Sequence, residues 1–167
     1  MSTAVFVRTA TVDDAEQVVA VMNGVIAEGT FTLFDTPFSL QDERDFIASR
    51  GPRSALYVAA GSDGDILGVQ SLDRFSTLAA SMRHVATMGT WLRRDARGRG
   101  IGRELAAQSL AFARRSGYTK IVIQVLAGNE NALRFYRDLG FTDIGVARQH
   151  VRLAGTLHDE IYLEMQL

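Results

Sequence analysis

The stretch TWLRRDARGRGIGREL, residues 90–105, combines glycines and arginines in a way that suits anion binding. Gly98, Gly100 and Gly102 alternate with larger residues, and arginines precede, separate and follow them. Apolar residues at helical spacing begin at Ile101, so the loop leads into a helix start, where free peptide N–H groups and the helix dipole attract phosphate. Because glycine has no side chain, a bulky diphosphate can approach the backbone. The alternative is a glycine-rich connection with solvated arginines.

Two common phosphate loops do not fit this stretch. A P-loop places Gly-Lys-Ser/Thr after its glycines, whereas residues 101–103 are Ile-Gly-Arg. A dinucleotide-binding fingerprint that began at Gly98 would have a small residue at Arg103 and an acidic residue about 20 positions later. The stretch SGYTK, residues 116–120, supplies no acid. A different phosphate ligand is therefore needed.

Other reactive groups are few. The chain has no cysteine, which excludes a disulfide, a thiolate metal ligand and a covalent cysteine intermediate. A Gly-x-Ser-x-Gly nucleophile motif is missing as well. His150 and His158 are too far apart to suggest a metal site, so we predict no metal.

Length and charge narrow the class of protein. A chain of 167 residues with 47% hydrophobic residues can form one domain, 1–167, around one core. The formal net charge of -1 gives no positive field for nucleic acid, and no aromatic residues interleave the arginines of residues 93–103, so a nucleic-acid module is disfavoured. The start, MSTAVFVRTA, is too short and polar for a signal peptide, and no apolar run nears about 18 residues. We expect a cytoplasmic protein without a membrane partner.

The hydrophobic pattern predicts the elements that must position the glycine loop. Ser39 and Asp42 form a helix-capping signal, Asn129 can cap a later helix, and the run KIVIQVL reads as a strand buried on both faces. The expected order is one strand, two helices, three strands, a helix, a strand, a helix and two strands. The strands are expected at 5–9, 55–60, 66–72, 84–92, 120–126, 142–150 and 157–165, and the helices at 11–29, 39–49, 101–116 and 130–139.

With this context the chain resembles the GNAT superfamily of N-acetyltransferases. The family's coenzyme A loop, Arg/Gln-x-x-Gly-x-Gly/Ala, matches Arg97, Gly100 and Gly102, and the segment NENALRFYRDLGF resembles the family's Asn-x-x-Ala…Tyr-x-x-Leu-Gly-Phe pattern. The resemblance is clear over residues 85–141. It implies an α/β fold with a central, twisted, mostly antiparallel sheet of about seven strands, one parallel β-α-β pair and four flanking helices. The segments GTFTLFDTPFSLQDERDFI and RQHVRLAGTLHDEIYLEMQL resemble the phosphinothricin acetyltransferase-like branch more loosely.

The resemblance implies that the anion is the diphosphate of acetyl-CoA, used as a cosubstrate. In the family, the strand before the loop splays from its parallel neighbour, and its free N–H groups bind the pantetheine arm and the thioester oxygen. The residues expected to bind acetyl-CoA are Trp91, Leu92, Arg97, Gly98, Arg99, Gly100, Ile101, Gly102, Arg103 and Asn129.

Direct attack of an amine on the thioester needs a general acid for the leaving thiolate. By resemblance this is Tyr136, whose ordinary pKa of about 10 keeps it protonated at neutral pH. Spacing alone favours the other interpretation, a core tyrosine whose hydroxyl is satisfied by a backbone partner.

The general base is left open by the sequence. Where phosphinothricin acetyltransferases carry a glutamate before the loop, this chain has Thr87, which cannot act as a base. Proton removal could use ordered water and backbone carbonyls instead. The remaining candidates for the base are Glu28, Asp35, Asp73 and His84.

Acceptor binding is expected after the first helix, where EGTFTLFD combines apolar and acidic residues. Phe31 and Phe34 could form an apolar pocket in which Glu28 and Asp35 hold a cationic amine, or the phenylalanines could be ordinary core. The expected partner is a small-molecule amine such as an amino acid analogue, an antibiotic or a polyamine.

Two alternative functions and one assembly are consistent with the same residues. The chain could acetylate protein N-termini or lysines, or it could be a non-catalytic acetyl-CoA sensor, which Thr87 favours and Tyr136 disfavours. Seven strands in a mostly open sheet leave edges, and the C-terminal stretch EIYLEM alternates apolar and polar residues like a strand covered on one face, so pairing of such elements in a homodimer is expected.

Overall fold

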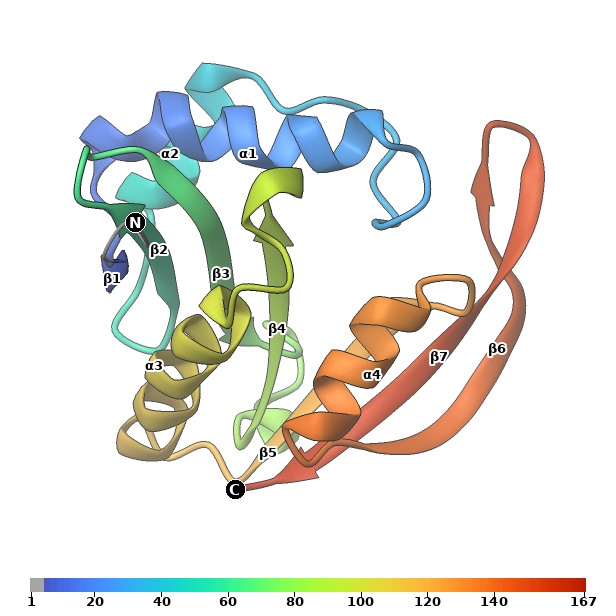
Figure 1. The fold of residues 1–167 in the computed structure, drawn as a ribbon. Coiled ribbons are helices and arrows are strands. Elements are labelled where there is room, and N and C mark those ends of the chain that lie inside the picture. The colour runs from blue at the N-terminus through green and yellow to red at the C-terminus, as the bar shows by residue number, and fades with distance from the viewer. Residues whose placement is uncertain (1–4) are drawn as a thin grey trace.

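The computed structural model describes residues 5–167 and has seven strands in one mixed sheet, flanked by helices (Figure 1). The strand order is β1-β2-β3-β4-β5-β7-β6, and only the β4–β5 pairing is parallel in the part described. The expected fold class is therefore confirmed. The strands are β1 (Val5–Thr9), β2 (Ala55–Gly61), β3 (Ile66–Arg74), β4 (Val85–Leu92), β5 (Lys120–Leu126), β6 (Thr142–Leu153) and β7 (Thr156–Gln166), and the helices are α1 (Ala15–Ala27), α2 (Leu40–Ala48), α3 (Ile101–Arg115) and α4 (Glu130–Asp138).

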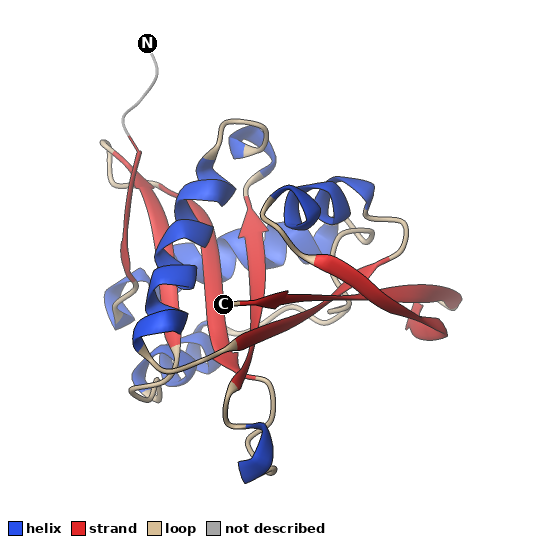
Figure 2. Ribbon diagram, turned by 90° about the horizontal axis from the view of Figure 1, so that it is seen from below, coloured by secondary structure: helices blue, strands red, loops and turns tan. Residues whose placement is uncertain are grey.

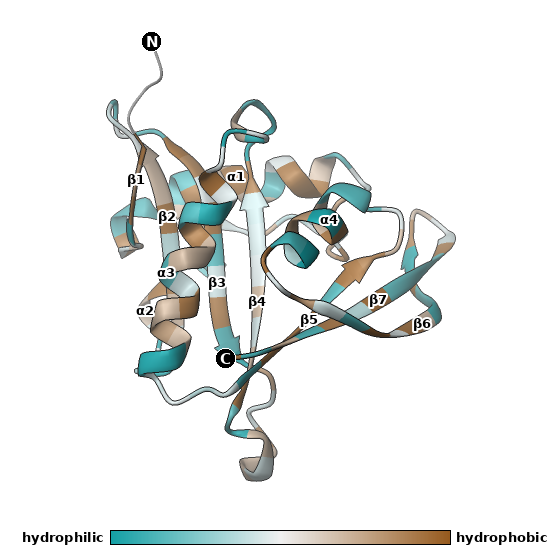
Figure 3. Cartoon of the chain, turned by 60° about the horizontal axis from the view of Figure 1, so that its bottom comes forward, coloured by the Kyte–Doolittle hydropathy of each residue, from teal (hydrophilic) through white to brown (hydrophobic). Residues whose placement is uncertain are grey.

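The N-terminal part of the sheet has helices on both faces (Figure 2). Alternate side chains of a strand point to opposite faces, so Leu56 and Val58 of β2 pack with α1 and α2, whereas Tyr57 and Ala59 pack with α3. β2 is buried along its whole length. The run KIVIQVL, expected to be a strand buried on both faces, forms β5 and is buried except at Gln124 and, in part, at Lys120. In Figure 3, β2 is accordingly coloured mostly as hydrophobic, while α3 carries hydrophilic residues on its outer side.

The parallel pair β4–β5 connects the two parts of the sheet. The strands pair at Val85–Lys120 and Ala86–Ile121 and then diverge, with α3 as the crossover between them (Figure 1). Beyond the divergence, β5 pairs with β7 over its whole length and α4 packs on this second part. The divergence leaves one edge of β4 free toward α4.

The C-terminal strands form a long hairpin that reaches past the sheet (Figure 1). We expected β6 to end at His150, but it continues to Leu153, with irregular pairing between Ala147 and Val151. Gln149 there has a positive φ of 50°, and its N–H donates to Asp159 at 2.7 Å. The irregular pairing shifts the register within β6 but does not end the strand.

In residues 5–167, no helix combines the length and apolar character needed to cross a membrane. The same residues contain no cluster of three His, Cys, Asp or Glu side chains that could hold a metal ion.

Candidate active site

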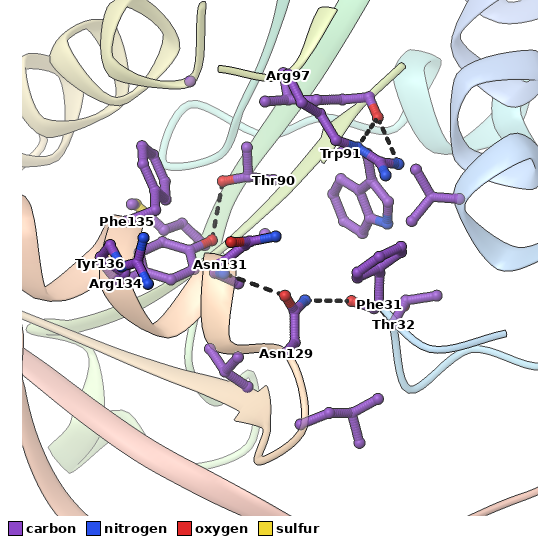
Figure 4. Close-up of a pocket in the computed structure, with 18 of the residues that line it drawn as sticks. Phe31, Thr32, Thr90, Trp91, Arg97, Asn129, Asn131, Arg134, Phe135 and Tyr136 are labelled. Atoms are coloured by element: carbon purple, nitrogen blue, oxygen red, sulfur yellow. Dashed lines mark hydrogen bonds between the residues drawn. The ribbon is translucent and has the colours of Figure 1, made fainter. Parts of the chain in front are cut away.

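A cavity of about 880 Å³ opens where β4 and β5 diverge, and its walls come from β4, the loop before α3, α4 and the segment after α1 (Figure 4). Its size lies in the range of small-molecule and cofactor sites. Of the residues expected to bind acetyl-CoA, all but Arg99, which is exposed, line the cavity. These residues are Trp91, Leu92, Arg97, Gly98, Gly100, Ile101, Gly102, Arg103 and Asn129.

The pleat of β4 divides the cavity into two sides. Trp91 packs against the part of the core that contains the buried residues of α1. Thr87 and Gly89 lie on the same face of β4 as Trp91, because side chains alternate along a strand. Met88 and Leu92 lie on the opposite face of β4, where Met88 packs in the part of the core that contains α4 and Leu92 packs against the part that contains α3. Thr90 lies on the same face as these two residues. The α1 side thus meets the segment expected to bind the acceptor, and the other side meets the expected acetyl-CoA loop.

The free edge of β4 offers backbone groups to the cavity. The carbonyl of Val85 accepts from Phe75, and the N–H of Arg93 donates to Leu67, so odd-numbered residues of β4 direct their backbone groups toward β3. The backbone groups of Met88, Thr90 and Leu92 therefore face the divergence. The expectation placed free N–H groups around Trp91 and Leu92. The structure agrees for Leu92, whereas Trp91 contributes only its side chain.

Two different structural constraints favour glycine in this loop, positive φ values at two positions and close helix packing at the third. Gly98 and Gly100 have φ values of 73° and 82°, which L side chains rarely adopt, and a Cβ atom on either would meet open space. Gly102 is inside α3, and a Cβ there would lie 3.1 Å from the Phe135 ring of α4. Gly98 and Gly100 thus leave the helix start open to a ligand, while Gly102 lets α3 and α4 pack closely.

Arg97 holds the segment after α1 to the loop. Its guanidinium pairs with the Glu28 carboxylate through two hydrogen bonds, one of them 2.9 Å long, and donates to the Leu92 carbonyl at 3.1 and 3.2 Å. It also lies 4.8 Å from the centroid of the Phe31 ring. The hydrogen bond from Arg97 lowers the pKa of Glu28, although burial opposes this shift. Glu28 is thus an ionised partner of Arg97 and not a cavity wall.

Asn129 joins α4 to the same segment (Figure 4). Its Oδ1 accepts from the Ala132 N–H at 3.1 Å, which caps α4 as expected. Its Nδ2 donates to the Phe31 carbonyl at 3.1 Å. Phe31 is therefore held by Arg97 on one side of the divergence and by Asn129 on the other.

Tyr136 reaches the cavity from α4 and is only 5% exposed. Its ring contacts Phe135 and Phe141, with centroids 5.0 and 5.5 Å away, and its hydroxyl is 2.9 Å from Thr90 Oγ1 (Figure 4). Burial raises the pKa of Tyr136 to about 12, and the hydrogen bond with Thr90 offsets part of that rise. The phenol is therefore protonated and able to donate at neutral pH.

Thr90 is itself bonded to Gln70, a fully buried residue of β3, whose Nε2 donates to Thr90 Oγ1 at 2.8 Å. Sequence reasoning missed both residues because neither belongs to a recognisable motif. It also missed Asn131 and Arg134 of α4, which line the cavity. Their position one helical turn or less from Asn129 and Tyr136 was a usable signal.

None of the four candidate bases lines the cavity, whereas Thr87, which cannot act as a base, does. Asp73 pairs with Arg50 at 2.8 Å, Asp35 is exposed and accepts from Thr36, and His84 is exposed. With Glu28 bound to Arg97, the cavity wall in the described residues contains one carboxylate, Asp138, which pairs with Arg103 at 3.3 Å. Of the predicted acceptor residues, Phe31 and Phe34 line the cavity, whereas Glu28 and Asp35 do not.

The family model described as "Acetyltransferase (GNAT) family" matches residues 21–141. This range covers the loop, α3, β5 and α4, all of which build the cavity. The chain belongs to the GNAT family of acetyltransferases, as the motif resemblance implied.

Individual relatives point to several acceptors. The chain is 33% identical over 99 residues to the N-alpha-acetyltransferase RimI of Mycobacterium tuberculosis, a match that covers 59% of this chain and 60% of that protein. It is 25% identical over 162 residues to the L-methionine sulfoximine/L-methionine sulfone acetyltransferase of Pseudomonas aeruginosa, covering 96% and 94% of the two chains.

Among solved structures, the chain is similar to a GNAT superfamily phosphinothricin acetyltransferase from Sinorhizobium meliloti in complex with acetyl-CoA. The TM-score is 0.90 at 20% identity, over 98% of this chain and 88% of the other. Phosphinothricin acetyltransferases are thus among the structural neighbours, and a neighbour with this fold holds the expected cosubstrate.

Proposed function

We propose that this protein transfers the acetyl group of acetyl-CoA to the primary amine of a small molecule by direct attack in a ternary complex. The observation that carries the proposal is the meeting, in one cavity, of a free strand edge, the glycine loop and the buried Tyr136 hydroxyl. The cavity draws on residues from Val25 to Asp138, which supports the view that the chain acts as one domain.

The residues fit acetyl-CoA in three respects. Gly98 and Gly100 leave space at the start of α3, where N–H groups without helical partners suit a diphosphate. The N–H groups on the free edge of β4, including that of Leu92, suit the amide-rich pantetheine arm and the thioester oxygen. Asn129 has an amide at the divergence that could exchange its bond to Phe31 for one to the arm.

In the proposed reaction the amine nitrogen bonds to the thioester carbon and the carbon–sulfur bond breaks, with its electron pair left on sulfur. Tyr136 gives its proton to that sulfur. The amine loses a proton, and since Thr87 cannot accept it, we propose that water and backbone carbonyls of the cavity carry it away. That proton restores Tyr136 through solvent, so the turnover balances.

We propose an acceptor with an apolar body and no second positive charge. The α1 side of the cavity is walled by Phe31, Phe34 and Trp91. The carboxylate expected to attract a cationic amine, Glu28, is already neutralised by Arg97. A polyamine would need carboxylates that this side does not offer among the described residues.

Release of free thiol from acetyl-CoA, measured with a panel of amines, tests the proposal. The panel should contain amino acid analogues with apolar side chains, aromatic amines, polyamines and a short peptide with a free N-terminus. We expect turnover with apolar small amines and little with polyamines. Faster turnover of the peptide would favour N-terminal protein acetylation, in line with the similarity to RimI. Tight binding of acetyl-CoA without turnover of any amine would favour a sensor.

We also propose that the chain forms a homodimer through the β6–β7 hairpin. β6 is an edge strand, and Ile144, Val146 and Leu157 of the hairpin are 50%, 52% and 41% exposed. Light scattering should give twice the mass of one chain, and Val146→Lys should shift the mass toward one chain. A single-chain mass for the unaltered protein at high concentration would exclude the dimer.

A further inference from the structure

A row of three polar side chains crosses the apolar interior behind the cavity. Gln70 of β3 lies directly opposite Thr90 of β4 in the register of the sheet, and Tyr136 approaches Thr90 from α4. The bond lengths along the row are 2.8 Å from Gln70 Nε2 to Thr90 Oγ1 and 2.9 Å from Thr90 Oγ1 to the Tyr136 hydroxyl oxygen. The row thus connects Gln70, which does not line the cavity, to the proposed general acid.

Gln70 is an unusual residue for its position. It is 0% exposed, and its neighbour on the same face of β3, Leu72, belongs to the apolar core. Its Oε1 has no hydrogen-bond partner within residues 5–167, so the amide is buried with only part of its capacity used. A leucine or methionine would avoid this cost, since buried polar groups destabilise a core unless they are paired. The amide therefore has a role that apolar packing cannot fill.

The supply of protons along the row suggests that role. Gln70 Nε2 can only donate, so Thr90 Oγ1 accepts from it and has one proton of its own. If Thr90 gives that proton to the Tyr136 oxygen, the Tyr136 proton is free to point elsewhere. In the reverse arrangement Tyr136 would donate to Thr90, and its proton would be engaged when the thiolate forms.

We propose that Gln70 and Thr90 are positioning residues that fix the direction of this row, so that Tyr136 presents its proton to the cavity and its oxygen accepts from Thr90. The proposal rests on the proposed function, in which Tyr136 protonates the leaving thiolate. When the proton passes to sulfur, the phenolate left behind keeps a hydrogen bond from Thr90, and Thr90 keeps one from Gln70. The row therefore stabilises the charge that develops on Tyr136.

This arrangement also acts against the effect of burial on acidity. Burial raises the pKa of Tyr136, which makes it a weaker acid, and the Thr90 hydrogen bond lowers the pKa. Without the row, Tyr136 would be a poorer donor at the same position. If Gln70 and Thr90 only joined β3 to β4, replacing them would not change how readily Tyr136 gives up its proton.

The test compares five single variants, one of which is Tyr136→Phe, and the double variant Thr90→Val/Tyr136→Phe, with an amine for which chemistry limits the rate. Thr90→Val removes the hydroxyl at nearly constant shape, Thr90→Ser keeps it, and Gln70→Met removes the amide at nearly constant length. Ser109→Ala is the matched control, because Ser109 is a fully buried residue of α3 whose hydroxyl has no partner in the described chain.

We expect Thr90→Val to lower kcat by roughly tenfold, with the KM values for acetyl-CoA and amine within about twofold, and Thr90→Ser to restore most of it. Gln70→Met should lower kcat less, because Thr90 can still donate to Tyr136. Ser109→Ala should keep the kcat of the unaltered protein. Thr90→Val in a Tyr136→Phe background should cause no further loss, since both changes act on one proton transfer.

Three results would overturn the inference. Thr90→Val and Gln70→Met could both keep full kcat while Tyr136→Phe is slow. This result would show that Tyr136 gives its proton to the thiolate equally well without the hydrogen bonds from Thr90 and Gln70. Thr90→Val could lower kcat equally in both backgrounds, which would show that Thr90 acts independently of Tyr136. Tyr136→Phe with full kcat would instead remove the proposed general acid itself. If Thr90→Val does not fold, Gln70→Met and its combination with Tyr136→Phe give the same comparison.

Discussion

Replacing Tyr136 by phenylalanine should lower turnover much more than it lowers stability. The ring keeps its contacts with Phe135 and Phe141, and the hydroxyl that is lost has one hydrogen-bond partner, Thr90. Thr90 keeps its bond to Gln70, so no buried group is left without a partner by the change. One such bond contributes about 0.5–1.5 kcal/mol to folding. A general acid contributes about 10²- to 10⁴-fold in rate, or about 3–5 kcal/mol of barrier.

The same variant should alter how stability depends on pH. The pKa of Tyr136 is raised from 10.0 to about 12 in the folded protein, so the stability that this shift contributes is fully present below pH 10. Above pH 10 the unfolded chain loses the Tyr136 proton while the folded chain keeps it, and the contribution is lost as the pH rises toward 12. The free energy of unfolding of Tyr136→Phe, relative to the unaltered protein, should therefore rise by up to about 1.4 kcal/mol per pH unit over that interval.

Both effects can be measured directly. Steady-state thiol release gives kcat and both KM values, and urea unfolding at pH 8, 10 and 11 gives the stability difference. We expect kcat to fall by at least about tenfold, since water can replace the phenol only in part, with acetyl-CoA affinity unchanged. A large loss of stability at pH 8 with normal kcat in the remaining folded protein would refute the reasoning and identify Tyr136 as a core residue only.

Three further predictions concern the ion pair of Asp14 and two residues near the cavity, Gly89 and Glu28. The Asp14 carboxylate accepts hydrogen bonds from Arg8 at 2.7 Å, which lowers the pKa of Asp14 to about 2. Asp14→Asn should therefore reduce the free energy of unfolding by about 1–2 kcal/mol at pH 6, measured by urea unfolding. The reduction should become smaller as the pH falls from about 4 toward 2, where Asp14 is protonated in the unaltered protein. A Cβ at Gly89 would lie 2.7 Å from the Trp91 ring, so Gly89→Ala should displace the indole. The KM for the amine should then rise several times more than the KM for acetyl-CoA. Equal changes in the two KM values would contradict the division of the cavity by β4. Glu28→Gln should weaken the hold of Arg97 on the segment after α1 and raise KM for the amine severalfold, with no more than about 1 kcal/mol lost from a partly exposed pair; an unchanged KM would mean that Phe31 stays in place without it.

Local signals predicted most of the fold because they act over a few residues. Ser39 accepts from the Asp42 N–H at 3.1 Å, and Asn129 caps α4, as their spacing indicated. The apolar pattern predicted the first helix at 11–29, and α1 buries Val18 and Val21 while it leaves Val19 half-exposed. A helix covered by both a sheet and α2 has a wider buried face than a single stripe, and the sequence does not show what covers it.

The parts of the site that sequence did not predict depend on contacts between distant residues. Arg97 and Glu28 are 69 positions apart, and Thr90 and Tyr136 are 46 apart. From the sequence, Glu28 is a carboxylate after a helix and fits acceptor binding or base chemistry equally well. Its pairing with Arg97 follows only from the way the sheet brings the end of α1 over the loop before α3. The divergence of β4 and β5 was expected only through the family resemblance, because nothing in either strand's own residues indicates it.

The glycine loop shows how one spacing can arise from unrelated causes. The sequence led us to expect that Gly98, Gly100 and Gly102 are all small so that a diphosphate can approach the backbone. At Gly98 and Gly100 the positive φ values and the open surroundings leave the start of α3 accessible, and phosphate binding there stays a prediction. At Gly102 the nearby atoms belong to Phe135, the residue next to Tyr136, so a side chain there would push against the helix that carries the proposed acid. A bulky residue at Gly102 would therefore affect chemistry as well as binding, and loss of activity in such a variant is weak support for a phosphate site. A Cβ at Gly98 or Gly100 would touch no atom of α4, but the positive φ strains any other residue there, so acetyl-CoA affinity must be measured together with stability.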